Sequence, residues 1–416
     1  MRTAKIITLG IALSLTTTTI NAQNPGGTPT PSTIDAQQEA EQPQPTKKWF
    51  DRINIRGYAQ VRYNRLLETN PDLGCDQCDK SWGGNGGFFF RRIRVIFYGQ
   101  VHPRVYFYIQ PDFASSVGDN LQIGQIRDAY FDVGLDKRNE YRLRFGQSKV
   151  PYGFENMQSS QNRLPLDRAD ATNSALKNER DIGVFFYWAP KKIRERFSML
   201  VREGFKGSGD YGVFGIGAYA GQTANSPELN NDPHYAARLS YPFVIGSQII
   251  EPGIQAYTGQ FEMPKNNLSK GVKYQEDMNY IDQRVAASFI LYPRPFGIQA
   301  EYNIGRGPEF NKATDSIEVR NLGGGYATLS YMIHAGNMLI YPFTRIQYYE
   351  GGKKHELDAR SYKVNELELG VEWEPIEAFE LVVMYTISSR RYEDFAKQNN
   401  FQQGNLLRIQ AQVNFR

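Results

Sequence analysis

The chain has 416 residues, 40% of them apolar and 13% aromatic, and its mean hydropathy is −0.53. That hydropathy excludes a polytopic helical membrane protein, which needs several apolar runs of roughly 20 residues. The 48 basic and 44 acidic residues give a formal net charge of +4, which is too balanced for a dedicated nucleic-acid binder. With 26 Tyr, 25 Phe and 38 Gly, the composition also argues against a disordered chain and favours an aromatic-rich β protein.

Residues 1–22 are predicted to be a secretory signal peptide. Arg2 and Lys5 precede an apolar, Thr-rich stretch over residues 6–20, and Ala22 is a small residue suited to signal peptidase. An N-terminal membrane anchor is the alternative, but the apolar stretch is short for a span. Residues 23–48 are rich in Pro, Gln and Thr and have no periodicity, so a disordered periplasmic segment is expected there.

From residue 49 to the end, apolar and polar residues alternate in repeated stretches, as in 53–64, and this period of two predicts β-strands. Their connections alternate between short and long, which is typical of an outer-membrane barrel and not of a soluble sandwich. The fold class predicted is all-β, a 16-stranded antiparallel transmembrane β-barrel of outer-membrane porin type. The sixteen strands are expected to start near residues 52, 88, 105, 123, 141, 180, 209, 234, 249, 281, 296, 320, 338, 362, 379 and 405.

The arginines indicate which strand face is wet, because an arginine facing lipid at the bilayer midplane costs roughly 2–4 kcal/mol. The polar parity must therefore face a water-filled lumen. The arginines on that parity are Arg52, Arg56, Arg62, Arg92, Arg94, Arg142, Arg144, Arg238, Arg284, Arg345 and Arg408. Arg91, Arg127 and Arg180 fall on the other parity, at strand ends next to long loops, where the cost is small.

The long connection over residues 148–178 is expected to fold into the lumen as a constriction loop. It carries apolar anchors such as Tyr152, Phe154 and Leu164, which a disordered loop would not need. The alternative is an outward-facing loop packed on its neighbours.

A short periplasmic helix is expected over residues 190–204. Ile193, Phe197 and Leu200 share one helical face, and Pro190 suits a first helical turn. A strand through Phe197, Met199 and Val201 is the competing interpretation.

Five stretches resemble one family, the phosphate-selective porins O and P of Gram-negative outer membranes. They are GFFFRRIRVIFYGQV (87–101), IRDAYFDVG (126–134), LRFGQSKVPYGFE (143–155), NERDIGVFFYW (178–188) and QYYEGGKKHELDARSYKVNELELGVEWEP (347–375), the last in a form common in Bacteroidetes-type members. The resemblance implies a 16-stranded barrel, a homotrimer and an anion path lined by basic residues, with phosphate selectivity in some members. The final Arg416 departs from the terminal Phe of many such barrels.

The residues expected to line an anion path lie on early strands, where arginine offers a permanent charge and a planar fork for oxyanions. They are Arg52, Arg56, Arg62, Arg92, Arg94, Arg142, Arg144 and Lys149. Acidic residues such as Asp112, Asp128 and Glu368 lie on other strands. Opposed acidic and basic walls producing a transverse field without strong selectivity are therefore the alternative to anion preference.

Cys75 and Cys78 form a CxxC in a long loop, where a local disulfide is expected in an exported protein. A zinc site would need two more suitable ligands nearby, and a haem site would need His in place of Asp79. The four His are scattered, and no Ser/His/Asp cluster is evident. No catalytic residue, metal or cofactor is therefore expected.

The function expected is an outer-membrane porin, a water-filled diffusion channel for small solutes that prefers anions, with phosphate or polyphosphate among them. The partners expected are small anions such as phosphate, outer-membrane lipid and lipopolysaccharide, and two further copies of the chain in a homotrimer; no nucleic acid is expected. One alternative is a barrel whose long extracellular loops bind a partner or surface ligand. Another is an outer-membrane enzyme.

Overall fold

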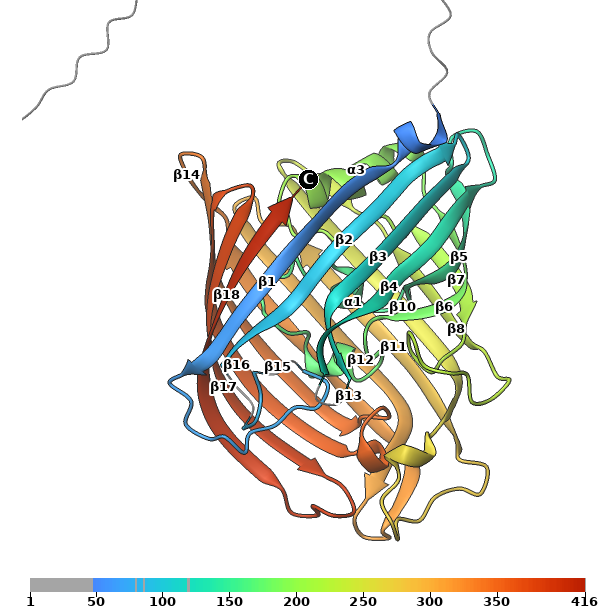
Figure 1. Ribbon diagram of the computed structural model, residues 1–416, viewed down its shortest axis with the longest axis vertical. Helices are drawn as coiled ribbons and strands as arrows, with labels where there is room; N and C mark the ends of the chain where they lie inside the picture. The colour runs from blue at the N-terminus through green and yellow to red at the C-terminus, as the bar shows by residue number, and fades with distance from the viewer. Residues whose placement is uncertain (1–47, 79–80, 85–86, 118–119, 416) are drawn as a thin grey trace, which may run out of the picture. The chain divides into compact units, whose positions relative to one another are not determined.

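The computed structural model describes residues 48–78, 81–84, 87–117 and 120–415 (Figure 1). The predicted signal peptide, and all but the last residue of the Pro/Gln/Thr-rich segment, lie outside the described residues. Among the helices in the described ranges, none is long and apolar enough to cross a membrane.

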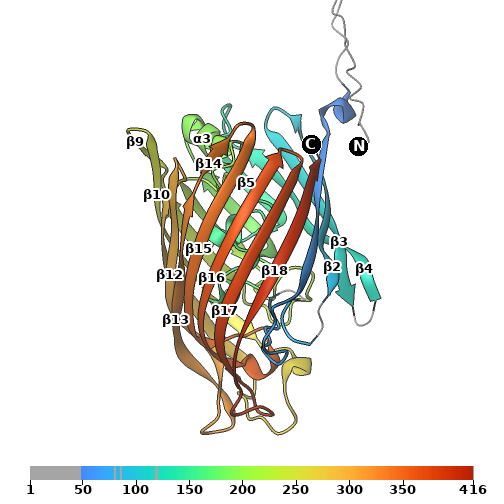
Figure 2. The ribbon, with the colours of Figure 1, turned by 90° about the vertical axis from the view of Figure 1, so that its left-hand side faces the viewer.

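The described strands form one antiparallel sheet in which each strand pairs with its neighbours in the chain, and β18 pairs with β1 to close it (Figures 1 and 2). The strands are β1 (Asn54–Leu66), β2 (Phe88–His102), β3 (Val105–Val117), β4 (Asn120–Gly134), β5 (Tyr141–Lys149), β6 (Arg180–Trp188), β7 (Phe214–Tyr219), β8 (His234–Ser240), β9 (Phe243–Ile245), β10 (Gln248–Glu262), β11 (Asn279–Leu291), β12 (Phe296–Asn311), β13 (Ser316–Tyr331), β14 (Ile333–Ala335), β15 (Met338–Gly352), β16 (Ser361–Ile376), β17 (Phe379–Glu393) and β18 (Phe401–Phe415).

Two of the sixteen barrel strands are each divided into two shorter segments. β8 and β9 both pair with β10, and β13 and β14 both pair with β15. Counting each pair once leaves sixteen strands in the described part of the chain. The predicted 16-stranded antiparallel barrel is therefore confirmed.

The helices are short except for one. They are η1 (Trp49–Arg52), α1 (Phe154–Met157), α2 (Asp170–Asn173), α3 (Lys191–Arg202), η2 (Lys265–Asn267) and η3 (Leu357–Ala359). α3 lies within the range given to a helix by the sequence, and it buries Ile193, Phe197 and Leu200. The competing strand through Phe197, Met199 and Val201 is not formed.

The barrel has two different ends. The C-terminus, η1 and α3 lie at the upper end in Figure 1, together with the short turns, and the long loops lie at the lower end. We call these the short-turn end and the long-loop end. In outer-membrane barrels short turns face the periplasm and long loops face the exterior.

The alternation separates a polar inside from an apolar outside. Apolar residues of the other parity, such as Ile55, Phe97 and Leu369, are exposed on the outer surface, where lipid would cover them. Most of the arginines expected to face the lumen are buried within the barrel: Arg62, Arg94, Arg142, Arg144, Arg238, Arg284, Arg345 and Arg408. One expectation is wrong: Arg52 lies in η1, ahead of the first strand, and is exposed.

Residues 150–179, which we call the inner loop, cross the inside of the barrel and include α1 and α2. The loop bonds to walls on different sides: Gln60 of β1 donates to the Ser160 carbonyl (3.1 Å), and Arg284 of β11 donates to the Ser174 hydroxyl (2.7 Å). Glu301 of β12 accepts the backbone N–H groups of Phe154 and Glu155 at the start of α1. These bonds satisfy amides that the short helix leaves open.

Candidate functional site

A polar cavity of about 80 Å³ lies between the inner loop and the wall made by β2 and β4. Seven arginines and two carboxylates line it, a formal excess of five positive charges. The lining residues are Gln77, Cys78, Arg91, Arg92, Arg94, Arg127, Arg163, Asp167, Arg168, Asn173, Asn178, Glu179 and Arg180. We call this the arginine cavity.

Two of its arginines reach the inside through β-bulges, which add one residue to one strand of a pair. Gln60 pairs with Arg92 and Val61 pairs with Phe90, so Arg91 is the extra residue on β2. On β4, Arg127 is likewise the extra residue opposite β3. The bulges turn both side chains inward, with guanidinium nitrogens 3.9 Å (Arg91) and 3.6 Å (Arg127) from lumen carboxylates.

The assignment of these arginines to the lipid-facing parity is therefore wrong, because the alternation shifts by one residue at each bulge. The same assignment fails for Arg180, which stands at the start of β6. Its Nε donates to Asp128 inside the barrel (2.9 Å). Three arginines that the sequence analysis left outside the site thus belong to it.

The inner loop contributes Arg163 and Arg168, which the sequence analysis did not place in the site. Both lie 3.1 Å from Glu179, which also contacts Lys149 (3.3 Å) and Arg180 (2.8 Å). Burial alone would raise the pKa of Glu179, but these four cations hold it well below its usual range. Glu179 is therefore an ionised counter-charge that holds the cations together.

Asp167, the other carboxylate that lines the cavity, has the same role. It accepts a short hydrogen bond from Arg408 and lies 3.4 Å from Arg62 and 3.9 Å from Arg91. The Trp82 indole donates at 3.3 Å to Oδ2, the same oxygen that accepts from Arg408. Burial would raise the pKa of Asp167, but the surrounding arginines lower it far below the usual value.

Of the eight residues expected to line an anion path, four gather at this cavity. Arg92 and Arg94 line it, and Arg62 and Lys149 contact its carboxylates. Arg94 is held in place by Asp112 (2.8 Å) and donates to the Tyr58 hydroxyl (2.8 Å).

The other four lie elsewhere. Arg142 bonds to Asp210 (2.8 Å) in the connection between α3 and β7, and Arg144 makes two bonds to Asp132 (2.7 and 2.9 Å). Arg52 donates to the Val101 carbonyl (2.8 Å), and Arg56 lies over the Tyr98 ring (5.3 Å to its centroid). The sequence pattern identified an inward face, but position along the strands decides which of these side chains meet.

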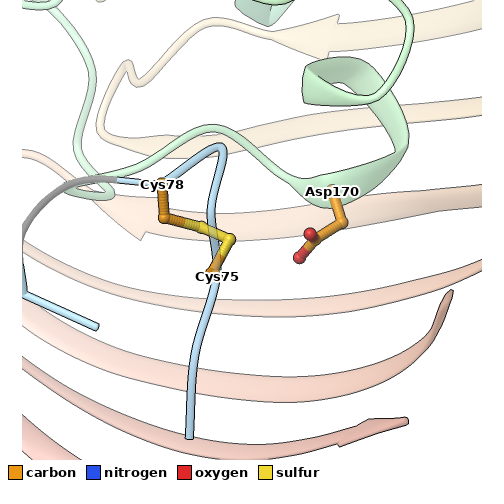
Figure 3. A group of neighbouring side chains, drawn as sticks. All are labelled: Cys75, Cys78 and Asp170. Atoms are coloured by element: carbon orange, nitrogen blue, oxygen red, sulfur yellow. A yellow bond between two sulfur atoms is a disulfide. The ribbon is translucent and has the colours of Figure 1, made fainter. Parts of the chain in front are cut away.

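Cys75 and Cys78 are joined by a disulfide, which lies beside Asp170 of α2 (Figure 3). These three residues are close enough together to resemble a metal site. However, disulfide sulfurs are not thiolate ligands, and Lys353 (2.5 Å) and Arg390 (2.9 Å) already neutralise Asp170. The disulfide instead stabilises the loop around residues 75–78, part of which lines the cavity. In that loop the Gln77 carbonyl accepts a hydrogen bond from Asn173 of α2 (3.0 Å).

The fold is similar to solved outer-membrane channels. The outer membrane channel DcaP of Acinetobacter baumannii matches with a TM-score of 0.55 and 16% identity, covering 87% of this chain and 97% of that one. The anion-selective porin from Comamonas acidovorans matches with a TM-score of 0.53 and 8% identity, covering 87% and 99%. OmpF of Salmonella typhi, solved with daunomycin, matches with a TM-score of 0.53 and 10% identity, covering 87% and 97%. At these identities the likeness shows the fold alone.

A comparison with curated protein sequences finds no significant relative. The family model for the phosphate-selective porins O and P, in contrast, matches residues 72–415. That range includes every strand but β1 and contains the whole arginine cavity. The chain therefore belongs to the phosphate-selective porin O and P family and is an outer-membrane porin, a channel and not an enzyme.

Proposed function

We propose that this porin is an anion-preferring diffusion channel and that the arginine cavity is the source of the preference. The observation that carries the proposal is the excess of five positive charges around a cavity of about 80 Å³. In a narrow passage with low-dielectric walls, charges of one sign concentrate counter-ions far more than they would on an open surface.

The alternative of opposed acidic and basic walls is weakened by where the acidic residues are. On β16, Glu366 binds Arg390 (2.8 Å) and Glu368 binds Arg345 (2.5 Å). These carboxylates are paired with buried arginines of β15 and β17, and β16 itself lies four strands away from β2 around the barrel. Among the described residues they make no ion pair with the arginines that line the cavity, whose carboxylate partners are Asp112, Asp128, Asp167 and Glu179.

We infer further that phosphate competes with chloride for binding in this cavity, and that polyphosphate binds there in the same way. Guanidinium groups present two parallel N–H donors that match the oxygens of phosphate. Chloride has no such geometry to exploit. We also propose that the inner loop is the constriction and that the protein is a homotrimer in the outer membrane.

The first prediction concerns ion selectivity. Reconstituted in a planar bilayer under a KCl gradient, the wild-type channel should give a reversal potential on the anion side. The variant Arg91→Gln/Arg92→Gln/Arg127→Gln should move that potential toward zero. It removes three charges from the cavity and leaves Arg94, which is tied to Asp112, in place.

The matched control removes the same number of charges from an exposed loop: Lys265→Gln/Lys270→Gln/Lys273→Gln. It should leave the reversal potential unchanged, since exposed charges are screened by salt. Anion preference that survives the cavity variant would contradict the proposal. A folded barrel with no conductance would instead favour the loops as binders of a partner.

A further inference from the structure

Part of the lumen is packed shut by apolar side chains. Ile290, Phe343 and Met384 point inward from β11, β15 and β17, where a water-filled lumen would call for polar residues. They pack against Phe154 of the inner loop and against Phe205, which follows α3. The remaining buried members of this cluster are Leu164, Leu166, Leu200, Ile249, Tyr292, Met332, Tyr341 and Val382.

Two segments that enter from opposite ends of the barrel meet at this cluster. The Gln158 amide of the inner loop donates to the Lys206 carbonyl (2.5 Å), in the connection between α3 and β7. Lys206 in turn binds Glu372 and Glu374 (3.0 Å to the latter). A second apolar cluster, which includes Tyr152, Leu176 and Tyr257, seals the inner loop against β6 to β11. Neither of these two clusters includes a residue of the wall formed by β1 to β5.

Along that wall, a row of tyrosines lies between the arginine cavity and the short-turn end. Tyr98 of β2 pairs with Tyr108 of β3, which pairs with Tyr130 of β4. Tyr98 follows the cavity residue Arg94 by four positions toward the short-turn end. Tyr108 and Tyr130 stack at 5.2 Å, and all three are partly exposed, unlike the buried inward residues of the packed side.

Arg56 is placed at one end of this row and differs from the other lumen arginines. Its guanidinium lies over the Tyr98 ring (5.3 Å) and close to Tyr106 and Tyr108. Among the described residues, no carboxylate lies within ion-pair distance of it, whereas Arg94 and Arg144 are both tied to aspartates. Arg56 is also partly exposed, so its charge is available to a solute.

We propose that Arg56, with the hydroxyls of Tyr98, Tyr106 and Tyr130, forms a second binding station for small oxyanions on the short-turn side of the arginine cavity. The guanidinium supplies charge and paired N–H donors, and the phenol O–H groups supply further donors. The proposal rests on the anion-preferring function proposed above and names the residues that receive the anion after the cavity.

The test measures block of the chloride current by inorganic phosphate added to one side of the bilayer at a time. A Lys137→Cys label in an exposed short turn, reached by an impermeant thiol reagent, identifies the short-turn side. For Arg56→Gln, the phosphate concentration that halves the current should rise about tenfold from the short-turn side, since one charged hydrogen-bonding partner is lost. It should change less from the long-loop side, where phosphate meets the cavity first.

Two further variants keep the test independent of folding defects. Tyr98→Phe/Tyr106→Phe/Tyr130→Phe retains the rings and removes the hydroxyls, and it should weaken block from the short-turn side by a few-fold, about the loss of neutral hydrogen bonds. Arg52→Gln is the matched control: this exposed arginine lies four residues from Arg56 but bonds to the Val101 carbonyl, and its block should equal wild type.

The outcomes separate the two proposals. If the cavity variant loses anion preference while Arg56→Gln and the triple Phe variant block like wild type from both sides, the second station is overturned and the proposed function stands. If the wild-type channel shows neither anion preference nor phosphate block, the proposed function fails, and the station fails with it.

Discussion

Individual side chains around the inner loop act mainly as counter-charges for buried arginines. Asp167 is the clearest case, because Arg408, Arg62 and Arg91 all lie within 4 Å of its carboxylate and Arg408 is fully buried. Removing one partner from such a group leaves uncompensated charge, which typically costs about 3–5 kcal/mol. The loss comes from the cations left behind and not from the removed carboxylate itself.

Asp167→Asn should therefore lower the free energy of unfolding by about 3–5 kcal/mol in denaturant titrations of the detergent-solubilised barrel. Asp76→Asn is the control, because Asp76 pairs with Arg360 (2.7 Å) but its side chain is 60% exposed. A solvent-exposed pair contributes at most about 1 kcal/mol. Equal effects of the two substitutions would show that Asp167 is not a shared counter-charge.

At the same scale, the sequence correctly predicted Arg62, Arg92 and Arg94 as inward-facing, because each lies in a part of its strand where strict alternation holds. It failed for Arg91 and Arg127, because a bulge inserts one residue and period-two reasoning has no means of detecting it. One signal was present: Arg91 and Arg92 are adjacent, so strict alternation would put one arginine into lipid. An adjacent pair of arginines inside a barrel strand is thus itself evidence for a bulge.

Among the elements, the connection between β15 and β16 shows how a long loop becomes part of the interior. Lys353 binds Asp170 of α2 (2.5 Å), and the neighbouring Lys354 binds Asp282 of β11. His355 packs edge-on against Phe261 (5.0 Å between ring centroids). Burial lowers the pKa of His355 well below its usual value, and the nearby Lys354 and Lys177 lower it further.

The histidine makes the stability of this loop depend on pH. A depressed folded pKa means that the stabilisation is present above the unfolded pKa of about 6.5 and is lost as the pH falls below it. Between pH 7 and pH 5, wild type should lose about 2 kcal/mol more of unfolding free energy than His355→Gln. The other three of the four His are the same in both proteins and cancel. Parallel pH profiles for the two proteins would contradict this.

The strands themselves were predictable, with most starting within four residues of the expected position; β7, expected near residue 209, begins at Phe214. α3 could also be found, because its apolar spacing is local. The burial of residues 205–208 and 353–356 could not be predicted, because it depends on partners far away in the chain, such as Glu372 for Lys206 and Asp282 for Lys354. Local patterns carry no information about such pairings.

For the molecule as a whole, the barrel could be predicted from the sequence, because the bilayer constrains the outer face of each strand. The packing inside the lumen could not be predicted in the same way. Lipid imposes an apolar exterior on every strand, so alternation and loop lengths were enough to define a closed barrel. The inside follows no single rule: one side carries partly exposed polar residues such as Arg56 and Tyr98, and the other carries buried apolar residues such as Phe343 and Met384. Those inward apolar residues already depart from the polar parity in the sequence, and they mark where the inserted segments pack.

The last prediction concerns assembly, which strand periodicity does not reveal and which rests on the family resemblance. Small outward-facing residues on the first strands add little support: a Cβ on Gly99 would lie 2.0 Å from the Arg52 carbonyl oxygen, so strand packing alone demands glycine there.

Light scattering in mild detergent should give three protein masses per particle. Because β18 closes onto β1 within one chain, each subunit has its own lumen. A single insertion into a bilayer should therefore show three equal conductance levels, which phosphate closes one at a time. A particle of one protein mass with a single conductance level would contradict the trimer while leaving the channel intact.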